Sequence, residues 1–203
     1  MMGNPMVGAV VLAAGKSERM GEPKMGLPWG DTTVIGQVIA TLMGVGLDDV
    51  VVVTGGGWEE VERALSYLPK HWPVRVVFNP DFAEGEMLSS LQKGVAALGE
   101  AFDAALITLG DQPQIQIGVV RIIVDIYYQS GASLVIPSYA MHRGHPMLIA
   151  RSLWAGLLAL RPPQTLRELV QAHQDKIVYV NVDTPSILQD LDTPEDYRQF
   201  KPG

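Results

Sequence analysis

Short apolar runs rich in β-branched residues alternate with helix-like patterns along almost the whole 203-residue chain, and this alternation limits the folds open to it. The expected strands cover residues 7–13, 50–54, 74–78, 104–109, 132–137 and 177–181; the expected helices cover 34–45, 58–67, 86–98, 117–129 and 165–173. Strands that are apolar throughout and alternate with helices form a mainly parallel sheet covered on both faces. We therefore expect a three-layer α/β/α protein, one domain over residues 1–203, with ligands at the carboxyl ends of its strands.

The loop after the first expected strand combines glycines with cations. Gly15 and Gly21 lie in this loop, together with Lys16, Arg19 and Lys24. Glycine lets backbone N–H groups approach a phosphate closely, and Lys and Arg offset the phosphate charge. The pattern predicts a triphosphate-binding loop; the alternative is a glycine-rich turn with solvated charges.

Two common phosphate-binding motifs do not fit this loop. Gly21 is followed by Glu22, where the P-loop requires Gly-Lys-Ser/Thr. Gly15 is followed by Lys16 and Ser17, where the dinucleotide fingerprint requires Gly-x-Gly-x-x-Gly. The loop therefore belongs to neither class.

A single acidic residue follows the fourth expected strand, in the sequence Gly110-Asp111-Gln112-Pro113. Mg²⁺ in proteins is commonly held by one or two carboxylates together with substrate phosphates. A carboxylate at the end of a buried strand, between Gly and Pro, suits such a site. Asp111 is the strongest single candidate for a metal ligand.

Two further segments follow expected strands. Thr54–Gly57 contains three consecutive glycines, which leave room for a base or ribose or form a plain turn into the next helix. After Asn79, Gly85 frees the backbone, and Ser89 or Ser90 is available to hydrogen-bond a base or ribose. The alternative for the serines is local bonding at a helix start.

The C-terminal half adds a cation, a histidine and two acidic residues. Arg143 and His145 follow the fifth expected strand, and a histidine beside proline is ordinarily structural. Asp190 and Asp192 alternate, so on an extended chain both side chains point the same way. Thr193 suits the N-cap of a final helix.

Two capping patterns are visible in this half of the chain. Thr193 is followed by Pro194 and, three residues later, by Asp196; Thr165 and Glu168 have the spacing of a capping box.

Composition excludes several classes of protein. The net charge of −7 argues against general nucleic-acid binding, and the absence of cysteine rules out disulfides and thiolate metal sites. No run approaches the ~18 apolar residues of a membrane span, and the N-terminus does not resemble a signal peptide. We expect a cytoplasmic protein that binds neither nucleic acid nor membrane.

The loop Leu12–Lys24 resembles the L-A-A-G-x-S-x-R-M-G-x-x-K motif of nucleotidyltransferases with a Rossmann-like fold, in particular the molybdenum cofactor cytidylyltransferases and their MobA-like relatives. Gly110–Pro113, Arg143–Pro146 and Asp190–Asp196 resemble further motifs of that family in the same order. The second of these motifs implies that Arg143 could clamp an acceptor phosphate and that His145 could donate a hydrogen bond there. The segment from Asn79 is similar too, with Glu86 as an additional residue between Gly85 and Met87.

The resemblance implies Mg²⁺-dependent transfer of CMP from CTP to molybdenum-bearing molybdopterin, with release of pyrophosphate. CTP is favoured over GTP because relatives that use GTP usually carry Leu-Ala-Gly-Gly in place of Leu-Ala-Ala-Gly. Asp111 and either Asp190 or Asp192, with Asp190 favoured, would hold the metal, and Lys24, Asp111 and Arg19 are the expected catalytic residues. The residues expected to contact the substrates are Leu12, Ala13, Ala14, Gly15, Lys16, Arg19, Lys24, Thr54, Gly55, Gly85, Ser89, Ser90, Arg143 and His145.

Two alternatives stay open. The chain could use another nucleotide or acceptor, such as GTP, a sugar phosphate or a phosphorylated alcohol, because one fold supports several substrates. It could also be a carrier that delivers finished cofactor to a recipient molybdoenzyme, although a carrier does not need the metal carboxylates.

Overall fold

The computed structural model describes residues 5–15, 17, 19–84 and 86–202. The strands are β1 (Val7–Ala13), β2 (Pro28–Trp29), β3 (Thr32–Thr33), β4 (Asp49–Thr54), β5 (Val74–Phe78), β6 (Ala104–Leu109), β7 (Leu134–Tyr139), β8 (His142–Arg143), β9 (Met147–Ala150) and β10 (Ile177–Asn181). The helices are α1 (Val34–Met43), α2 (Trp58–Leu65), α3 (Glu86–Leu98), α4 (Ile117–Ser130), α5 (Trp154–Ala159), α6 (Leu166–Ala172) and α7 (Pro194–Phe200). None of the helices in these ranges is long and apolar enough to cross a membrane.

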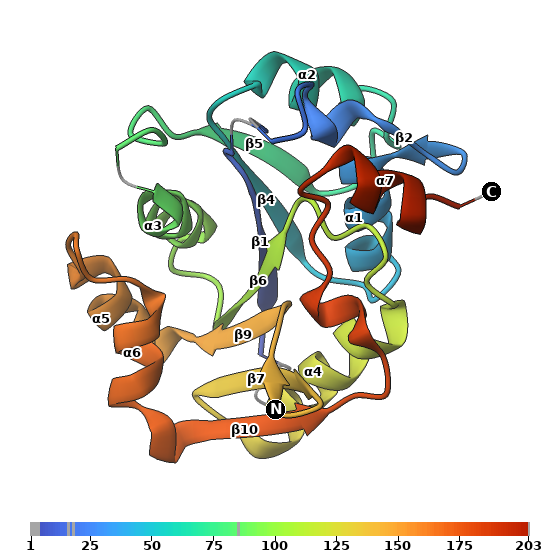
Figure 1. Ribbon diagram of the computed structural model, residues 1–203. Helices are drawn as coiled ribbons and strands as arrows, with labels where there is room; N and C mark the ends of the chain where they lie inside the picture. The colour runs from blue at the N-terminus through green and yellow to red at the C-terminus, as the bar shows by residue number, and fades with distance from the viewer. Residues whose placement is uncertain (1–4, 16, 18, 85, 203) are drawn as a thin grey trace.

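One mixed sheet runs through the middle of the molecule, and the predicted α/β fold is confirmed (Figure 1). Its strand order is β10-β7-β9-β6-β1-β4-β5, with β8 paired to β7. All six predicted strands are present, and β1 pairs in parallel with both β4 and β6. The carboxyl ends of β1 and β6 therefore lie side by side, as Leu12 and Leu109 do in the register.

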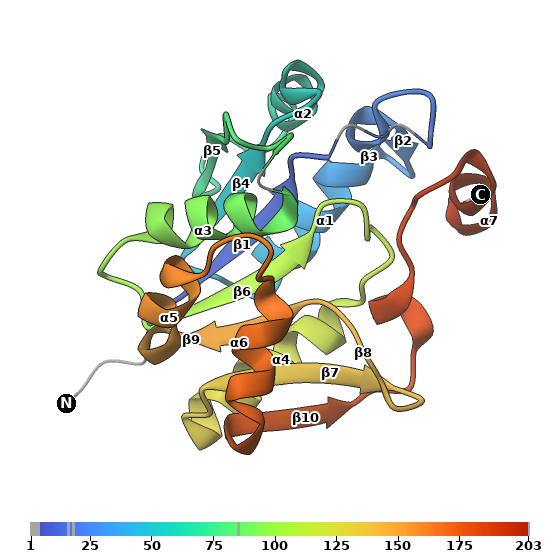
Figure 2. The same cartoon turned by 60° about the vertical axis from the view of Figure 1, so that its left-hand side comes forward.

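Alternate residues of β1 face two separate apolar layers, as the period of two in a strand requires. Val7, Ala9 and Val11 pack with α1, α2 and α4 on one face. Val10 and Leu12 pack with α3, α5 and α6 on the other. Both layers of helices are visible in Figures 1 and 2, so the sheet is covered on both faces.

The sequence pattern missed the shortest elements. β9 is a four-residue strand that runs antiparallel between β6 and β7. The antiparallel pair β2–β3 has two residues in each strand, which is too short for any periodicity. The predicted strand at 132–137 lies two residues later, at Leu134–Tyr139, and the helix α5 was not predicted.

The C-terminal segment returns from β10 across the carboxyl ends of the strands. It passes through a 3₁₀ turn (Pro185–Leu188) and ends in α7, which packs against β2 (Figure 1). The rings of Trp29 and Tyr197 lie 6.3 Å apart, centroid to centroid. Both predicted capping boxes are present, from Thr165 to Glu168 in α6 and from Thr193 to Asp196 in α7.

Candidate functional site

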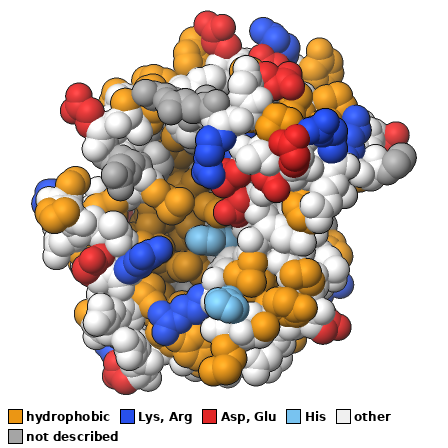
Figure 3. Space-filling model, in the orientation of Figure 1, with side chains coloured by type: hydrophobic (Ala, Val, Ile, Leu, Met, Phe, Trp, Pro, Cys, Tyr) orange, Lys and Arg blue, Asp and Glu red, His pale blue; other side chains and the backbone are white. Residues whose placement is uncertain are grey.

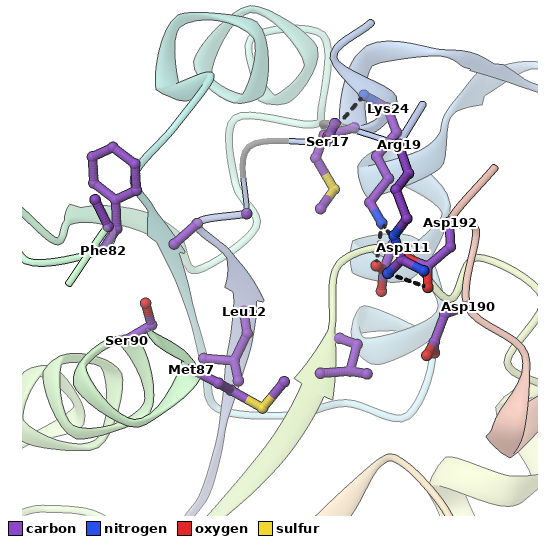
Figure 4. A pocket seen from close by; sticks show the side chains of 15 residues that line it. Leu12, Ser17, Arg19, Lys24, Phe82, Met87, Ser90, Asp111, Asp190 and Asp192 are labelled. Atoms are coloured by element: carbon purple, nitrogen blue, oxygen red, sulfur yellow. Dashed lines mark hydrogen bonds and ion pairs between the residues drawn. The ribbon is translucent and has the colours of Figure 1, made fainter. Parts of the chain in front are cut away.

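A cavity of about 620 Å³ opens beyond the carboxyl ends of β1 and β6. Figure 3 shows this face as a hollow with an apolar interior, with acidic and basic side chains gathered on one side. Figure 4 shows the same division, with charged side chains on one wall and apolar ones on the other. The described lining residues are Leu12, Ala14, Gly15, Ser17, Arg19, Lys24, Met25, Phe82, Ala83, Met87, Ser90, Leu109, Asp111, Asp190 and Asp192.

Lys24 is the centre of the charged wall. It begins a 3₁₀ turn (Lys24–Gly26), and its side chain is only 9% exposed. Lys24 Nζ donates to Asp111 Oδ2 at 2.6 Å and to Asp192 Oδ1 at 3.3 Å. A buried ammonium requires such partners, so Lys24 joins the end of β6 to the C-terminal segment.

Arg19 and Ser17 complete this wall on the side of the loop after β1. The Arg19 guanidinium pairs with Asp192 Oδ2 at 2.8 Å and is otherwise largely exposed. Ser17 Oγ accepts from the backbone N–H of Lys24 at 3.4 Å. Asp192 therefore holds both cationic groups, one on each carboxylate oxygen.

Asp190 has a different partner, although it lines the same cavity. Its Oδ1 accepts from Gln112 Nε2 at 2.6 Å, and Gln112 is 1% exposed. Burial, followed by repulsion from Asp111, raises the pKa of Asp190, while the Gln112 hydrogen bond opposes the rise. A bound cation would relieve the repulsion between the two carboxylates.

The donor chemistry of this wall fits a divalent cation such as Mg²⁺. Asp111 and Asp190 offer hard oxygen ligands within electrostatic reach of each other. Across the described residues, no three acidic or histidine side chains gather so as to hold a metal by themselves. A two-carboxylate site of this kind is completed by substrate phosphates and water.

The opposite wall is apolar apart from one hydroxyl. Leu12, Phe82 and Met87 line it, and Ser90 projects from α3 (Figure 4). The buried side chain of Asn79 donates to Ser89 Oγ at 2.9 Å and to Ser90 Oγ at 3.0 Å. The sequence indicated these serines but not the amide that holds them.

Gly55 differs from its expected use. A Cβ at Gly55 would lie 2.5 Å from the Cβ of Phe82 and 3.0 Å from the Cβ of Ala14. The space that the glycine leaves is therefore filled by Phe82, which forms the cavity wall, and is not open to a base or ribose.

Arg143 and His145 lie outside the cavity lining, although His145 is within electrostatic reach of Asp111. The Arg143 guanidinium lies 5.2 Å from the centroid of the Tyr179 ring. His145 is partly buried, and burial lowers its pKa to about 4, against the opposing pull of Asp111. His145 is therefore uncharged at neutral pH, and neither residue lines the cavity.

The remaining predicted contacts divide into three groups. Leu12, Ala14, Gly15, Arg19, Lys24 and Ser90 line the cavity together with the three aspartates. Ala13, Thr54, Gly55 and Ser89 lie behind its walls. Lys16 and Gly85 lie outside the described residues.

Sequence reasoning missed Gln112 and Asn79. The sequence pattern assigns neither residue a role: Gln112 lies in the Gly-Asp-Gln-Pro segment, and Asn79 follows the third expected strand. A signal was present in both cases, because a polar amide just beyond the end of a strand needs partners that the strand does not supply.

The geometry of fold and site is that of a nucleotide-binding α/β protein, and comparison with known proteins agrees. A model of the MobA-like NTP transferase domain matches residues 9–187. The chain therefore belongs to the MobA-like nucleotidyltransferase family and is a nucleotidyltransferase.

Two relatives and two solved structures of one further protein illustrate the match. The molybdenum cofactor cytidylyltransferase of Escherichia coli (strain K12) is 26% identical over 191 residues, which cover 94% of this chain and 93% of that protein. The nicotine blue oxidoreductase of Paenarthrobacter nicotinovorans is 33% identical over 156 residues, 73% of each chain.

The crystal structure of Rv0371c from Mycobacterium tuberculosis H37Rv is similar with a TM-score of 0.81 and 30% identity, over 98% of both chains. A structure of that protein in complex with manganese has a TM-score of 0.74 and 28% identity, over 97% of this chain and 98% of that chain.

Proposed function

We propose that this nucleotidyltransferase is a Mg²⁺-dependent cytidylyltransferase that transfers CMP from CTP to molybdenum-bearing molybdopterin. The observation that carries the proposal is the charged wall, where Lys24 and Arg19 meet Asp111, Asp190 and Asp192 at the mouth of an apolar cavity. Cations for a polyphosphate and carboxylates for a metal lie side by side there, as nucleotidyl transfer requires.

The loop after β1 would bind the triphosphate. Lys24 and Arg19 would move from the carboxylates to the β- and γ-phosphates, since a polyanion is a stronger partner than one shared carboxylate. Gly15 leaves the backbone open to the phosphates: apart from its chain neighbours, the described residues place no atom within 4 Å of the position that a Cβ would take. Both cations would then offset the charge that develops on the departing pyrophosphate.

Asp111 and Asp190 are the residues that would hold Mg²⁺. A metal at this position supplies charge neutralisation and orients the phosphates for in-line displacement. Asp192 would instead serve as the resting partner of Lys24 and Arg19, because both of its oxygens already carry these cations. Gln112 would keep the Asp190 carboxylate turned towards Asp111.

The transfer itself needs positioning more than a protein acid or base. An oxygen of the acceptor phosphate attacks the α-phosphorus, and a new P–O bond forms. The bond from the α-phosphorus to the oxygen that bridges it to the β-phosphorus breaks, and its electron pair leaves with pyrophosphate. Arg143 and His145 do not line the cavity, so in this proposal an acceptor that extends beyond it would place its phosphate at Arg143, with the uncharged His145 as a hydrogen-bonding neighbour.

Two observations support the choice of CTP and molybdopterin. The sequence Leu12-Ala13-Ala14-Gly15 has the form typical of cytidylyltransferases. A relative named molybdenum cofactor cytidylyltransferase matches along nearly its whole length. Another relative carries the name of an oxidoreductase, so the acceptor has to be measured directly.

The test is pyrophosphate release with Mg²⁺, with CTP or GTP, and with molybdenum-loaded molybdopterin as the acceptor. Asp111→Asn keeps the size of the side chain and removes one carboxylate; we expect it to lower turnover at least a hundredfold while the protein stays folded. Asp175→Asn, at an exposed position away from the cavity, is the matched control. Release with GTP but not CTP, or full activity of Asp111→Asn, would contradict the proposal.

A further inference from the structure

The side chain of Asn79 has a fixed orientation. Asn79 follows β5, is 1% exposed, and its backbone N–H donates to the Thr54 carbonyl at 2.8 Å. Its Oδ1 accepts from the backbone N–H of Asp81 at 3.1 Å, and a backbone N–H can only donate. Oδ1 and Nδ2 therefore cannot exchange places.

This orientation determines the role of two serine hydroxyls. The amide nitrogen of Asn79 donates its two hydrogens to Ser89 Oγ at 2.9 Å and Ser90 Oγ at 3.0 Å. Because an amide NH₂ cannot accept, both serine oxygens act as acceptors in these bonds. The proton of each hydroxyl must then point to another partner.

The two serines differ in where that proton goes. Ser89 donates to the Asp81 carbonyl at 3.4 Å. Ser90 is 3% exposed, and its Oγ accepts from Asn79 but donates to no acceptor within the described part of the chain. Ser90 lines the apolar wall of the cavity, and its hydroxyl rises from α3 towards the space below Phe82 (Figure 4).

We propose that Asn79 is a positioning residue that fixes Ser90 as a hydrogen-bond donor to the nucleobase. The inference rests on the proposed nucleotide substrate. It adds that the protein donates the hydrogen bond and that the base accepts it. The apolar wall receives the flat face of the base, and the single donor selects an edge that carries a carbonyl oxygen or ring nitrogen. Cytosine offers both, as O2 and N3.

Equilibrium binding without an acceptor tests this inference separately from turnover. Titrations with CTP and with ribose 5′-triphosphate, which lacks the base, compare the wild type with Ser90→Ala. We expect Ser90→Ala to weaken CTP roughly three- to tenfold, the value of one hydrogen bond, and to leave ribose 5′-triphosphate unchanged. Ser89→Ala, which removes the other acceptor of the same amide, should weaken CTP less than Ser90→Ala does.

Variants of Asn79 test the positioning role. In Asn79→Asp the new carboxylate can only accept, so Ser90 turns its proton inward and CTP binding falls as far as in Ser90→Ala. If Asn79→Asp does not fold, Asn79→Ala is used in its place. We expect its CTP affinity to lie between those of the wild type and Ser90→Ala. A double variant that combines Ser90→Ala with Asn79→Asp or Asn79→Ala should bind CTP as tightly as the single variant Ser90→Ala does.

Three results would overturn the inference. Equal losses for CTP and ribose 5′-triphosphate would place Ser90 on the ribose or phosphates. Unchanged CTP affinity in Ser90→Ala would remove the contact, and additive losses in the double variant would show that Asn79 acts by another route. The absence of pyrophosphate release with intact binding would contradict the proposed reaction and leave this inference standing.

Discussion

Lys24 joins three parts of the chain that are far apart in sequence. Its ammonium lies 2.6 Å from Asp111 and 3.3 Å from Asp192, and its side chain is almost fully buried. Without a nucleotide, the ammonium occupies one oxygen of the carboxylate that we assign to the metal. Under the proposed function, Lys24 and a divalent cation would therefore compete for Asp111 until a triphosphate drew the lysine away.

Lys24→Met tests this competition. We expect the nucleotide-free variant to bind Mn²⁺ on the order of tenfold more tightly than the wild type, because a cation next to Asp111 has been removed. Turnover should fall at the same time, since the triphosphate loses its lysine. Titration of free Mn²⁺ by electron paramagnetic resonance measures the first effect.

Arg19→Met is the matched control for Lys24→Met. It removes a cation of equal charge, but one that contacts Asp192 and not Asp111. Its Mn²⁺ affinity should rise less than that of Lys24→Met. Equal Mn²⁺ affinities in the two variants would show that the contact of Lys24 with Asp111 does not cause the increase.

Among single residues, the sequence predicted those site residues whose chemical type and position after a strand indicate a role. Asp111 follows a strand and Lys24 lies in a glycine-containing loop, and the structure brings both to one wall. The type and place of Gln112 and Asn79 show only that each amide needs partners, not which partners it has. Gln112 acquires its partner 78 residues away, and the partners of Asn79 depend on how α3 docks on β5.

One segment of the chain carries both C-terminal aspartates, and several elements hold it in place. His145 N–H donates to the Ile187 carbonyl at 3.1 Å, and Leu191 N–H donates to the Asp111 carbonyl at 3.0 Å. The Gln114 amide donates to the Gln189 carbonyl. Displacement of this segment would move Asp190 away from Asp111.

Gly144→Ala should displace the segment. A Cβ at Gly144 would lie 2.2 Å from the Ile187 carbonyl oxygen, so the backbone would have to move. We expect a loss of about 1–3 kcal/mol in the free energy of unfolding, as for other overpacked sites, and weaker Mn²⁺ binding. Urea denaturation and Mn²⁺ titration measure the two effects.

Gly118→Ala is the matched control for Gly144→Ala. Gly118 lies in α4, and outside its chain neighbours and its own helix backbone the described part of the chain has no atom within 4 Å of the position that a Cβ would take. Because alanine favours a helix, this change should stabilise the protein by about 0.5–1 kcal/mol without altering Mn²⁺ binding. Gly144→Ala with wild-type stability and metal affinity would refute the close contact at Ile187.

The elements were predictable to the extent that they are long and periodic. α3 and β5 have the predicted bounds, and both capping boxes follow from residue types at fixed spacing. β9 was missed because four apolar residues after a proline carry no period that separates a strand from a loop.

The strand order of the whole molecule was beyond the reach of the sequence pattern. Strand patterns show which residues are buried but not which strand lies beside which, and β9 enters between β6 and β7 in the antiparallel sense. The order matters for the site, since it places His145, just before β9, within electrostatic reach of Asp111.

Burial of His145 couples the stability of the whole fold to pH. Burial lowers the pKa of His145 from 6.5 to about 4 in the folded protein, while the unfolded chain keeps the ordinary value. Between pH 6.5 and 4 the unfolded state therefore binds a proton that the folded state does not. The stability gained from the neutral imidazole is present above pH 6.5 and is lost on acidification, by up to about 3 kcal/mol near pH 4.

Asp190 has the opposite effect on the free energy of unfolding as the pH falls. Burial and Asp111 raise its pKa, so on acidification the folded state takes up this proton before the unfolded state does. The effect of His145 is therefore isolated by comparing the wild type with His145→Gln, which cannot titrate and retains Asp190. We expect the free energy of unfolding from urea denaturation to fall less steeply between pH 7 and pH 4.5 in the variant. Parallel profiles for the two proteins would mean that His145 takes up its proton equally in the folded and unfolded states.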